Sequence, residues 1–283
     1  MAKCRKQLCG KGKVLQTYIS SKRKSLLDAN HLGSFETLWG YQSEWFEAPN
    51  DDRNGWSGVN RLSLSSPDGE SLGVFLKRQQ NYVRRTFLHP FTGESTFTCE
   101  FRTMRFLLKR GVPVPKPVFF DEKPSANGLQ AILMTEELVG YRPLDVVIEE
   151  LFNRPDTTLK VKRALIASVA RAVRKLHYAR IQHRALYPKH LFVNMNNPEN
   201  PDVVIIDLEK ARIKLIPIMR MLQDVSTLNR RLSDLSRTNR LYFFKHYYGV
   251  DKLGTWTKLM CRLVLWRSHK SDRPSHASTP GLV

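Results

Sequence analysis

Residues 158–179 carry the longest helical pattern in the chain, TLKVKRALIASVARAVRKLHYA. Apolar side chains recur on one stripe of this helix, which another element must cover. They are Leu165, Val169, Ala172, Val173 and Leu176. Strand-like patterns precede this helix, and further helical patterns follow it. The order therefore predicts a β-rich half followed by a helical half, dividing near residues 137–143, where a Gly and a Pro interrupt the pattern.

The β-rich half contains a predicted hairpin. The runs GVNRLSLSS and SLGVFLKRQ flank the turn signal PDGE, and Lys77 lies near the end of the second run. A helical stripe follows and ends at Gly111. Its apolar residues are Phe101, Met104, Leu107 and Leu108. After it, KPVFFDE and LQAILMTEEL predict two more strands, and RPLDVVIEELF predicts a short helix.

The formal net charge of +20 is the most unusual bulk feature. Such a charge attracts polyanions, among them nucleic acid, anionic lipid and phosphorylated sugar, without choosing between them. Residues 1–27 hold eight basic side chains and no acidic one. No apolar run reaches the roughly 18 to 20 residues of a membrane span. The basic N-terminus has no apolar segment behind it, so we expect a cytoplasmic protein.

Two further stretches place polar residues beside strand-like runs. HRALYPKHLFVN, residues 183–194, follows the long helix. Asp207 comes after VVII, four β-branched residues typical of a buried strand. A carboxylate that leaves such a strand is well placed to bind Mg²⁺. The structural alternative is an aspartate that caps a turn.

Five stretches in this order resemble one family of protein-kinase-like enzymes: VFLKRQ, CEFRTMRFLLKRGVPVPKPV, IQHRALYPKHLFVN, VVIIDLEKAR and LSRTNRLYFFKHYYG. Over roughly residues 50–250 the chain resembles the bacterial lipopolysaccharide core heptose kinase (Kdo/WaaP) family, in particular its InaA-like branch. The resemblance implies an α+β, two-lobed protein-kinase-like fold. Its expected parts are a mobile basic leader (1–30), a β-rich nucleotide-binding N-lobe (31–140), a helical C-lobe with the catalytic loop and metal site (141–266), and a flexible tail (267–283).

The resemblance implies an ATP site in the N-lobe. The family uses a lysine such as Lys77, at a strand end after a hairpin, to reach the nucleotide phosphates. Glu100 follows 23 residues later in the next helix and would pair with Lys77. Gly55 and Gly58, in NGWSGVN, would supply backbone N–H groups to phosphate, although the segment is not a full GxGxxG. The structural alternative for Lys77 is a strand-end lysine in water.

The implied Mg²⁺ site joins Asp207 and His190. Asp207 matches the aspartate of the kinase DFG motif, while Leu208 and Glu209 depart from its Phe and Gly. His190 stands where protein kinases have a metal-binding asparagine. A histidine at this position resembles the pattern of the lipopolysaccharide kinases. We therefore expect both residues to act in metal binding and catalysis.

The catalytic loop departs from the family pattern at Ala185. This residue replaces the aspartate of HRD, which orients the acceptor hydroxyl in kinases. Alanine neither accepts a proton nor orients a hydroxyl by hydrogen bonding. The candidates to take over this role are His190, Lys189 and Tyr187.

Three residues are expected to support the catalytic loop. His183 and Arg184 match the first two residues of HRD, and the resemblance implies that they face inward beneath the metal loop. Asp224, in MLQDVSTL on the next helix, resembles the kinase aspartate that holds the backbone of this loop. A simple surface charge is the alternative for Asp224.

Two functions from different classes remain open. The first is an ATP-dependent kinase acting on a hydroxyl of a lipopolysaccharide-core sugar or another phosphorylated glycoconjugate, at the anionic inner face of the inner membrane. The second is a pseudokinase-like binding or regulatory protein that lacks the catalytic aspartate. Nucleic-acid binding is disfavoured because no recognition motif for it is present. No local motif determines the acceptor sugar or the oligomeric state.

Overall fold

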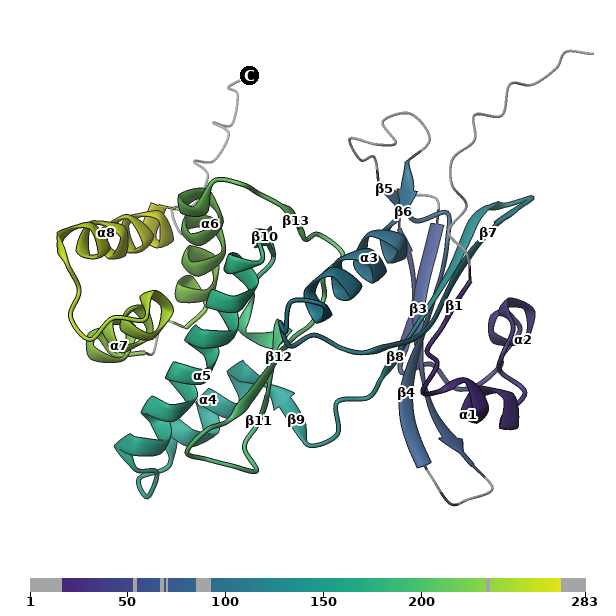
Figure 1. The fold of residues 1–283 in the computed structure, drawn as a ribbon, viewed down its shortest axis with the longest axis horizontal. Coiled ribbons are helices and arrows are strands. Elements are labelled where there is room, and N and C mark those ends of the chain that lie inside the picture. Colours follow the sequence, from purple (N-terminus) through teal and green to yellow (C-terminus); the bar gives the residue numbers. More distant parts are fainter. Residues whose placement is uncertain are drawn as a thin grey trace, which may run out of the picture.

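A six-stranded antiparallel sheet builds the first half of the molecule (Figure 1). The computed structural model describes residues 17–270 apart from 53–54, 67–68, 70, 85–92 and 233–234. The strand order is β1-β7-β8-β4-β3-β2. The bounds are β1 Tyr18–Ile19, β2 Glu47–Asp52, β3 Gly55–Ser65, β4 Ser71–Gln80, β7 Pro117–Ser125 and β8 Gly128–Glu136. β3 and β4 pair along their length, which confirms the predicted hairpin.

The two faces of the sheet are covered by different helices. Helices α1 (Lys24–Ala29) and α2 (Phe35–Trp39) lie on one face, and α3 (Thr96–Leu108) lies on the other, toward the helical half (Figure 1). Because side chains alternate along a strand, Val74 and Leu76 of β4 pack beneath α1 and α2. Lys77 lies between Leu76 and Arg78 in the strand, so its side chain points to the opposite face, toward α3.

Part of the predicted N-terminal leader, residues 17–30, is built into the fold. β1 lies at the edge of the sheet and pairs with Phe119 and Phe120 of β7. Helix α1 buries Leu26 and Leu27 among apolar residues of distant strands. Residues 17–30 therefore belong to the fold rather than to the mobile leader expected at 1–30. Residues 1–16 lie outside the described ranges.

Helix α5 (Leu159–Tyr178) is the longest helix of the second half, and its predicted apolar stripe is buried. The other helices are α4 Leu144–Asn153, α6 Pro217–Arg230, α7 Arg237–Tyr248 and α8 Thr255–Lys270. Helix α7 packs on α5, and α8 packs on α6. One apolar core continues from Phe97 and Phe101 of α3 to Val264 of α8, so it joins the two halves.

The end of α8 differs from the predicted domain boundary. The helix continues to Lys270, past the boundary expected at residue 266, and residues 271–283 of the expected tail lie outside the described ranges. Among the helices that the structure describes, none has both the length and the apolar character needed to span a bilayer.

Short strands bring the two ends of the predicted catalytic loop together. The short strands outside the six-stranded sheet are β5 Val83–Arg84, β6 Glu94–Ser95, β9 Tyr141–Pro143, β10 Ile181–Gln182, β11 Leu191–Asn194, β12 Asp202–Ile205 and β13 Arg212–Ile213. β10 enters the loop and pairs with β13, while β11 leaves the loop and pairs with β12. Since β12 and β13 flank Asp207, these pairings place Asp207 beside residues 183–194.

We expect Leu27→Ala to lower the free energy of unfolding by about 2–5 kcal/mol, because Leu27 is fully buried beneath the sheet. Urea unfolding followed by tryptophan fluorescence measures this change. Leu159→Ala is the matched control, since Leu159 is 55% exposed, and it should change stability by less than about 0.5 kcal/mol. Equal effects of the two substitutions would contradict the place of α1 in the core.

Candidate active site

An ion pair joins the sheet to α3. Lys77 Nζ donates a hydrogen bond of 3.0 Å to Glu100 Oε1. The Glu100 side chain is 3% exposed and that of Lys77 is 26% exposed. Ser95 caps α3 by accepting a hydrogen bond from the N–H of Thr98, which fixes where the helix starts. Glu100 therefore lies in the second turn, on the side that faces β4.

The electrostatics of Lys77 connect it to the predicted metal residue. Burial alone lowers the pKa of the Lys77 ammonium. The charge and hydrogen bond of Glu100 outweigh this effect together with the charges of Asp207 and Glu47, and the pKa lies above its ordinary value. Lys77 therefore stays positively charged and lies close enough to Asp207 to interact with its charge. A cation in this position is what a contact to nucleotide phosphates requires.

Gly55 and Gly58 lie within β3 rather than in a loop. A Cβ on Gly58 would meet the Trp45 ring at 2.6 Å, so this position must be glycine for Trp45 to pack there. Gly58 pairs with Arg78, which points to the opposite face of β4 from Lys77. At Gly55 the obstacle to a Cβ is a backbone carbonyl of β4, 2.4 Å away. Packing explains both glycines, and Gly58 faces away from the ion pair.

His190 and Asp207 face each other. His190 Nε2 lies 3.3 Å from Asp207 Oδ2, and His190 Nδ1 lies 2.8 Å from the carbonyl oxygen of Ala185. When the imidazole is neutral, Nδ1–H donates a hydrogen bond to this carbonyl, and Nε2 carries a free lone pair. Two acceptor atoms in this position suit a cation between them. A histidine that is oriented through its other ring nitrogen is the usual form of a metal ligand.

The backbone at Asp207 directs its carboxylate away from the core. The residue has a φ of 57°, a left-handed conformation that is uncommon outside glycine. The preceding residue, Ile206, donates its N–H to the His190 carbonyl at 3.0 Å, and its own carbonyl accepts from His183 Nε2 at 2.9 Å. These two hydrogen bonds hold the end of β12 in place. The Asp207 side chain is 34% exposed, so water and phosphate oxygens have access to it.

The donor set at this position fits Mg²⁺. This ion is bound in many phosphotransferases by one or two carboxylates, with water and substrate phosphates as its other ligands. Asp207 offers the carboxylate, and His190 lies beside it. No group of three or more His, Cys, Asp or Glu side chains suited to a metal occurs among the residues that the structure describes. The site therefore lacks the all-protein cage that a structural metal would need.

Asp224 of α6 binds the backbone of the catalytic loop. Its buried carboxylate accepts hydrogen bonds from the N–H of His183 at 2.7 Å and from the N–H of Arg184 at 2.8 Å. Arg184 has a φ of 69°, a conformation that costs free energy and persists only where the surroundings impose it. The burial of Asp224 excludes the alternative of a surface charge.

Two more helices reach Asp224 through buried side chains. His177 Nε2 of α5 lies 3.1 Å from Asp224 Oδ2, and His177 Nδ1 lies 2.7 Å from the Tyr247 hydroxyl of α7. Burial and then the neighbouring Tyr248 raise the pKa of Tyr247 well above its ordinary value, so its hydroxyl stays neutral. Helices α5, α6 and α7 thus support the loop through one row of hydrogen bonds.

His183 and Ala185 are buried beneath the site, whereas the Arg184 side chain, expected to face inward with His183, is exposed. Burial lowers the pKa of the His183 imidazole, although the charges of Asp224 and Asp207 oppose the shift. The neutral ring donates from Nε2 to the carbonyl of Ile206. Ala185 is 4% exposed, and its carbonyl oxygen accepts hydrogen bonds from His190 Nδ1 and from a backbone N–H two residues on.

The sequence patterns missed Glu209 and Arg84. Burial raises the pKa of the Glu209 carboxyl, and the charges of Asp207 and Glu100 raise it further, so three carboxyl groups converge near Lys77. Arg84 of β5 donates a 2.7 Å hydrogen bond to the Glu209 carbonyl. Glutamate in place of the DFG glycine was an available signal for Glu209. A two-residue strand gives no comparable signal for Arg84.

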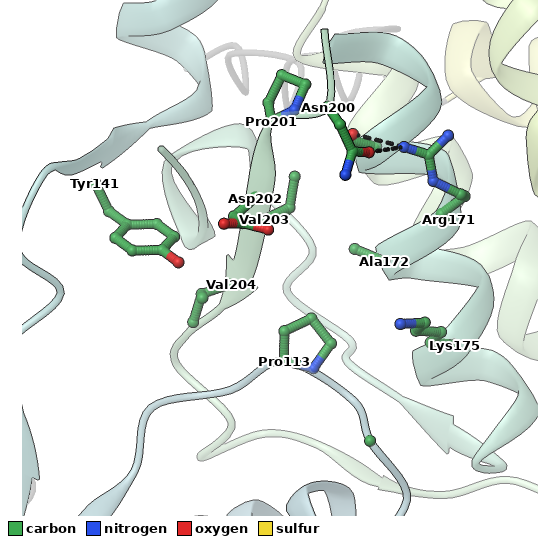
Figure 2. Close-up of a pocket in the computed structure, with 12 residues that line it drawn as sticks. Pro113, Tyr141, Arg171, Ala172, Lys175, Asn200, Pro201, Asp202, Val203 and Val204 are labelled. Atoms are coloured by element: carbon green, nitrogen blue, oxygen red, sulfur yellow. Dashed lines mark hydrogen bonds between the residues drawn. The ribbon is translucent and has the colours of Figure 1, made fainter. Parts of the chain in front are cut away.

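A cavity of about 410 Å³ lies apart from these residues, between α5 and β12 (Figure 2). Figure 2 shows Arg171 and Lys175 on the side of α5, with Tyr141 and Asp202 opposite them and Arg171 bonded to Asn200. None of the residues lining this cavity is one that the sequence predicted for the active site. The candidate site is therefore defined by its ion pairs and hydrogen bonds rather than by the cavity.

Known proteins are similar to this chain in sequence and in fold. The model of the lipopolysaccharide kinase (Kdo/WaaP) family matches residues 36–247. Protein InaA of Escherichia coli (strain K12) is 27% identical over 216 residues, 76% of this chain and 96% of that protein. The lipopolysaccharide core heptose(I) kinase WaaP of Pseudomonas aeruginosa is 30% identical over 181 residues, 62% of this chain and 67% of that protein. A solved structure of WaaP in complex with acyl carrier protein has a TM-score of 0.66 and 22% identity, over 91% of this chain and 98% of that one, so the fold is shared.

We expect Asp224→Ala to lower the free energy of unfolding by about 2–6 kcal/mol, because it leaves one buried and one partly buried backbone N–H group without an acceptor. Asp224→Asn keeps one acceptor oxygen, so its free energy of unfolding should lie between those of Asp224→Ala and the unmodified chain. Urea unfolding again provides the measurement. Asp251→Ala, at an exposed aspartate, is the control. A loss at Asp224 no larger than the loss at Asp251 would show that the loop does not depend on this carboxylate.

Proposed function

The chain belongs to the lipopolysaccharide kinase (Kdo/WaaP) family, and we propose that it transfers the γ-phosphoryl group of ATP to a hydroxyl of a lipopolysaccharide-core sugar. The observation that carries this function is the approach of the Lys77–Glu100 ion pair to Asp207, which faces His190. A fixed cation and a metal-binding carboxylate are the two groups that phosphoryl transfer needs most.

The nucleotide end of the site would be formed by four residues. Lys77 would contact the phosphates of ATP, and Glu100 would hold the lysine in that position. Asp207, with His190 beside it, would hold Mg²⁺, which neutralises charge on the phosphate oxygens when bound. The structure offers support for the ion pair and for the metal position, and packing accounts for Gly58 without a phosphate contact.

Transfer would join the acceptor oxygen to the γ-phosphorus and break the bond from that phosphorus to the β,γ-bridging oxygen, releasing ADP. The hydroxyl proton would pass to water or to a neighbouring base. Because the transition state is loose, positioning and charge neutralisation supply most of the catalysis. The base that Ala185 cannot provide is typically worth about 10² to 10⁴-fold in rate. Of the candidates to replace it, His190 lies against Asp207.

Three arginines would receive the acceptor. Burial, followed by the charges of Arg212 and Arg84, lowers the pKa of Arg184, so these guanidinium groups lie close enough to repel one another. An anion between them would relieve this repulsion, and a guanidinium fork matches the oxygens of phosphate and carboxylate. We infer that the arginines bind anionic groups of a phosphorylated core sugar. Such an acceptor is lipid-linked, which would place the chain at the anionic inner face of the inner membrane.

A binding or regulatory role without transfer is the second candidate function. Ala185 is the observation that favours it, because the side chain that orients the acceptor hydroxyl in kinases is missing. Lys77, Glu100 and Asp207 would then bind MgATP without turnover. The two functions agree on nucleotide binding and differ only in ADP release.

ATP turnover by the purified protein separates the two functions. ADP release should require Mg²⁺ and should rise when deacylated lipopolysaccharide core is added. Because the similar WaaP structure contains acyl carrier protein, each reaction should be run with and without that protein. MgATP binding without core-dependent ADP release under either condition would favour the binding role.

We expect MgATP to stabilise the chain and Lys77→Met to remove that effect. At a nucleotide concentration a hundredfold above Kd the stabilisation should be about 2.7 kcal/mol. Thermal-shift titration measures it for the unmodified chain, for Lys77→Met and for Lys160→Met, whose side chain is 71% exposed at the start of α5. The control should keep the full shift. If millimolar MgATP leaves the melting temperature of the unmodified chain unchanged, the proposed nucleotide site is refuted.

Ala185→Asp should raise the rate of phosphate transfer about tenfold or more, equivalent to about 1.4 kcal/mol of transition-state stabilisation. The reason is that a carboxylate at this position can orient the acceptor hydroxyl while Asp207 and His190 keep the metal position. Steady-state kinetics with deacylated core provide the test, and Ala185→Asn is the control of similar size without a base. If another residue already acts as the base, Ala185→Asp should change little and His190→Ala should abolish turnover.

A further inference from the structure

The chain leaving the candidate site exposes an unusual run of large apolar side chains. The exposed fractions are Ile213 61%, Leu215 67%, Ile216 53%, Ile218 36% and Met219 46%. We call these five residues, with Tyr178 and Trp256, the apolar surface. Patches of exposed apolar residues on a folded domain mark sites of interaction with another surface.

Distant parts of the chain meet in this surface. Tyr178 at the end of α5, Ile218 at the start of α6 and Trp256 at the start of α8 line one cavity of about 160 Å³. Tyr178 and Trp256 are 70% and 58% exposed. Helices α6 and α8 lie side by side (Figure 1). The surface is therefore built by the tertiary fold and is not confined to one loop.

A buried arginine determines which way the run faces. Arg220 of α6 is 5% exposed and donates hydrogen bonds to the carbonyls of Lys214 and Leu215, the second at 2.9 Å. The N–H of Lys214 donates to the carbonyl of Arg180 at 2.9 Å. The polar backbone of the run is thus satisfied toward the protein, which leaves the side chains of Leu215 and Ile216 pointing outward.

The charge around the apolar surface is positive. The stretches 174–184, 210–223 and 252–270 contain no Asp or Glu, and Lys214 lies within the apolar run itself. Lysine is depleted in the cores of protein interfaces. Exposed aliphatic and aromatic side chains among Lys and Arg are instead typical of segments that lie in the headgroup region of a membrane. Anionic lipid is the occupant that matches both the charge and the apolar side chains.

The apolar surface is joined directly to the catalytic loop and to the metal residue. β13 carries Ile213 and pairs with β10, which continues into His183. The run begins six residues after Asp207. A membrane bound here would lie next to Arg212, which precedes Ile213 and is one of the arginines proposed to receive the acceptor.

We propose that the apolar surface docks on a membrane that contains anionic lipid, with Leu215, Ile216 and Trp256 inserted among the headgroups. The docking orients the candidate site toward a lipid-linked acceptor. That benefit for turnover rests on the proposed kinase function, whereas the binding itself does not.

Co-sedimentation of the full chain with vesicles tests the docking. The unmodified chain should bind vesicles of phosphatidylethanolamine and phosphatidylglycerol more tightly than vesicles of phosphatidylcholine, and added salt should weaken the binding. The double variant Leu215→Ser/Ile216→Ser should bind the anionic vesicles about tenfold or more weakly, because two exposed aliphatic side chains no longer insert. Trp256→Ala should weaken binding independently. Val146→Ser/Leu159→Ser, at exposed apolar residues of α4 and α5, should bind like the unmodified chain.

Three results would overturn the proposal. One is vesicle binding that does not distinguish anionic from neutral lipid, and another is equal loss of binding in the control and the surface variants. The third is a dimer in size-exclusion chromatography that the double variant converts to a monomer, since the surface would then be an interface between two copies.

Activity measurements separate this proposal from the proposed function. The double variant should transfer phosphate to deacylated core at the unmodified rate and should be slower on lipopolysaccharide embedded in anionic vesicles. Equal rates of the double variant and the unmodified chain on the embedded acceptor would contradict the orienting role. An unmodified chain that phosphorylates neither acceptor would refute the kinase function, while the vesicle measurements would still decide the docking.

Discussion

A buried carboxylate fixes the geometry of the candidate site. An unpaired charge in the interior of the helical half would cost several kcal/mol, so Asp224 is stable there only with its donors in place. Two of those donors are the backbone N–H groups of His183 and Arg184, and the third is the His177 ring. The loop must therefore take the path that brings these groups to Asp224. That path in turn places His183 beneath Ile206 and the Ala185 carbonyl against His190, so the meeting of His190 with Asp207 depends on Asp224.

This arrangement explains how the chain tolerates alanine at position 185. The loop is held by backbone groups and by Asp224, and residue 185 contributes its carbonyl oxygen rather than its side chain. Losing the aspartate therefore removes a base from the site without disturbing the path of the loop. The frame for nucleotide and metal binding and the chemistry of proton removal are physically separable here, which is why kinase and binding functions remain distinct hypotheses for one structure.

The sequence predicted those parts of the fold that depend on local patterns. The hairpin, the two later strands and helices α3 to α5 each have a periodicity that their own residues reveal. Prediction from the sequence failed for β1 and α1. The two-residue strand β1 forms only by pairing with β7, and Leu26 and Leu27 of α1 are buried only by distant strands. The candidate site followed the same division. Lys77 and Glu100 lie within regular elements and Asp207 follows one, so their patterns were found, whereas Arg84 reaches the Glu209 carbonyl across a long separation in sequence.

The charge of the chain also has two physical origins that composition cannot separate. Arg78 donates to the carbonyls of Trp39 and Tyr41, and Arg220 donates to those of Lys214 and Leu215. Burial lowers the pKa of both guanidinium groups, yet arginine remains protonated in proteins, so these cations satisfy backbone acceptors inside the fold. The formal charge of +20 thus includes arginines that no polyanion can reach. Attraction to an anionic surface must come from the exposed lysines and arginines. The positions of these residues determine which surface of the protein binds. Around residues 210–223 the exposed basic residues lie among outward-facing apolar side chains. Arg220 produces this arrangement, because it binds the backbone carbonyls of Lys214 and Leu215 on the inner side.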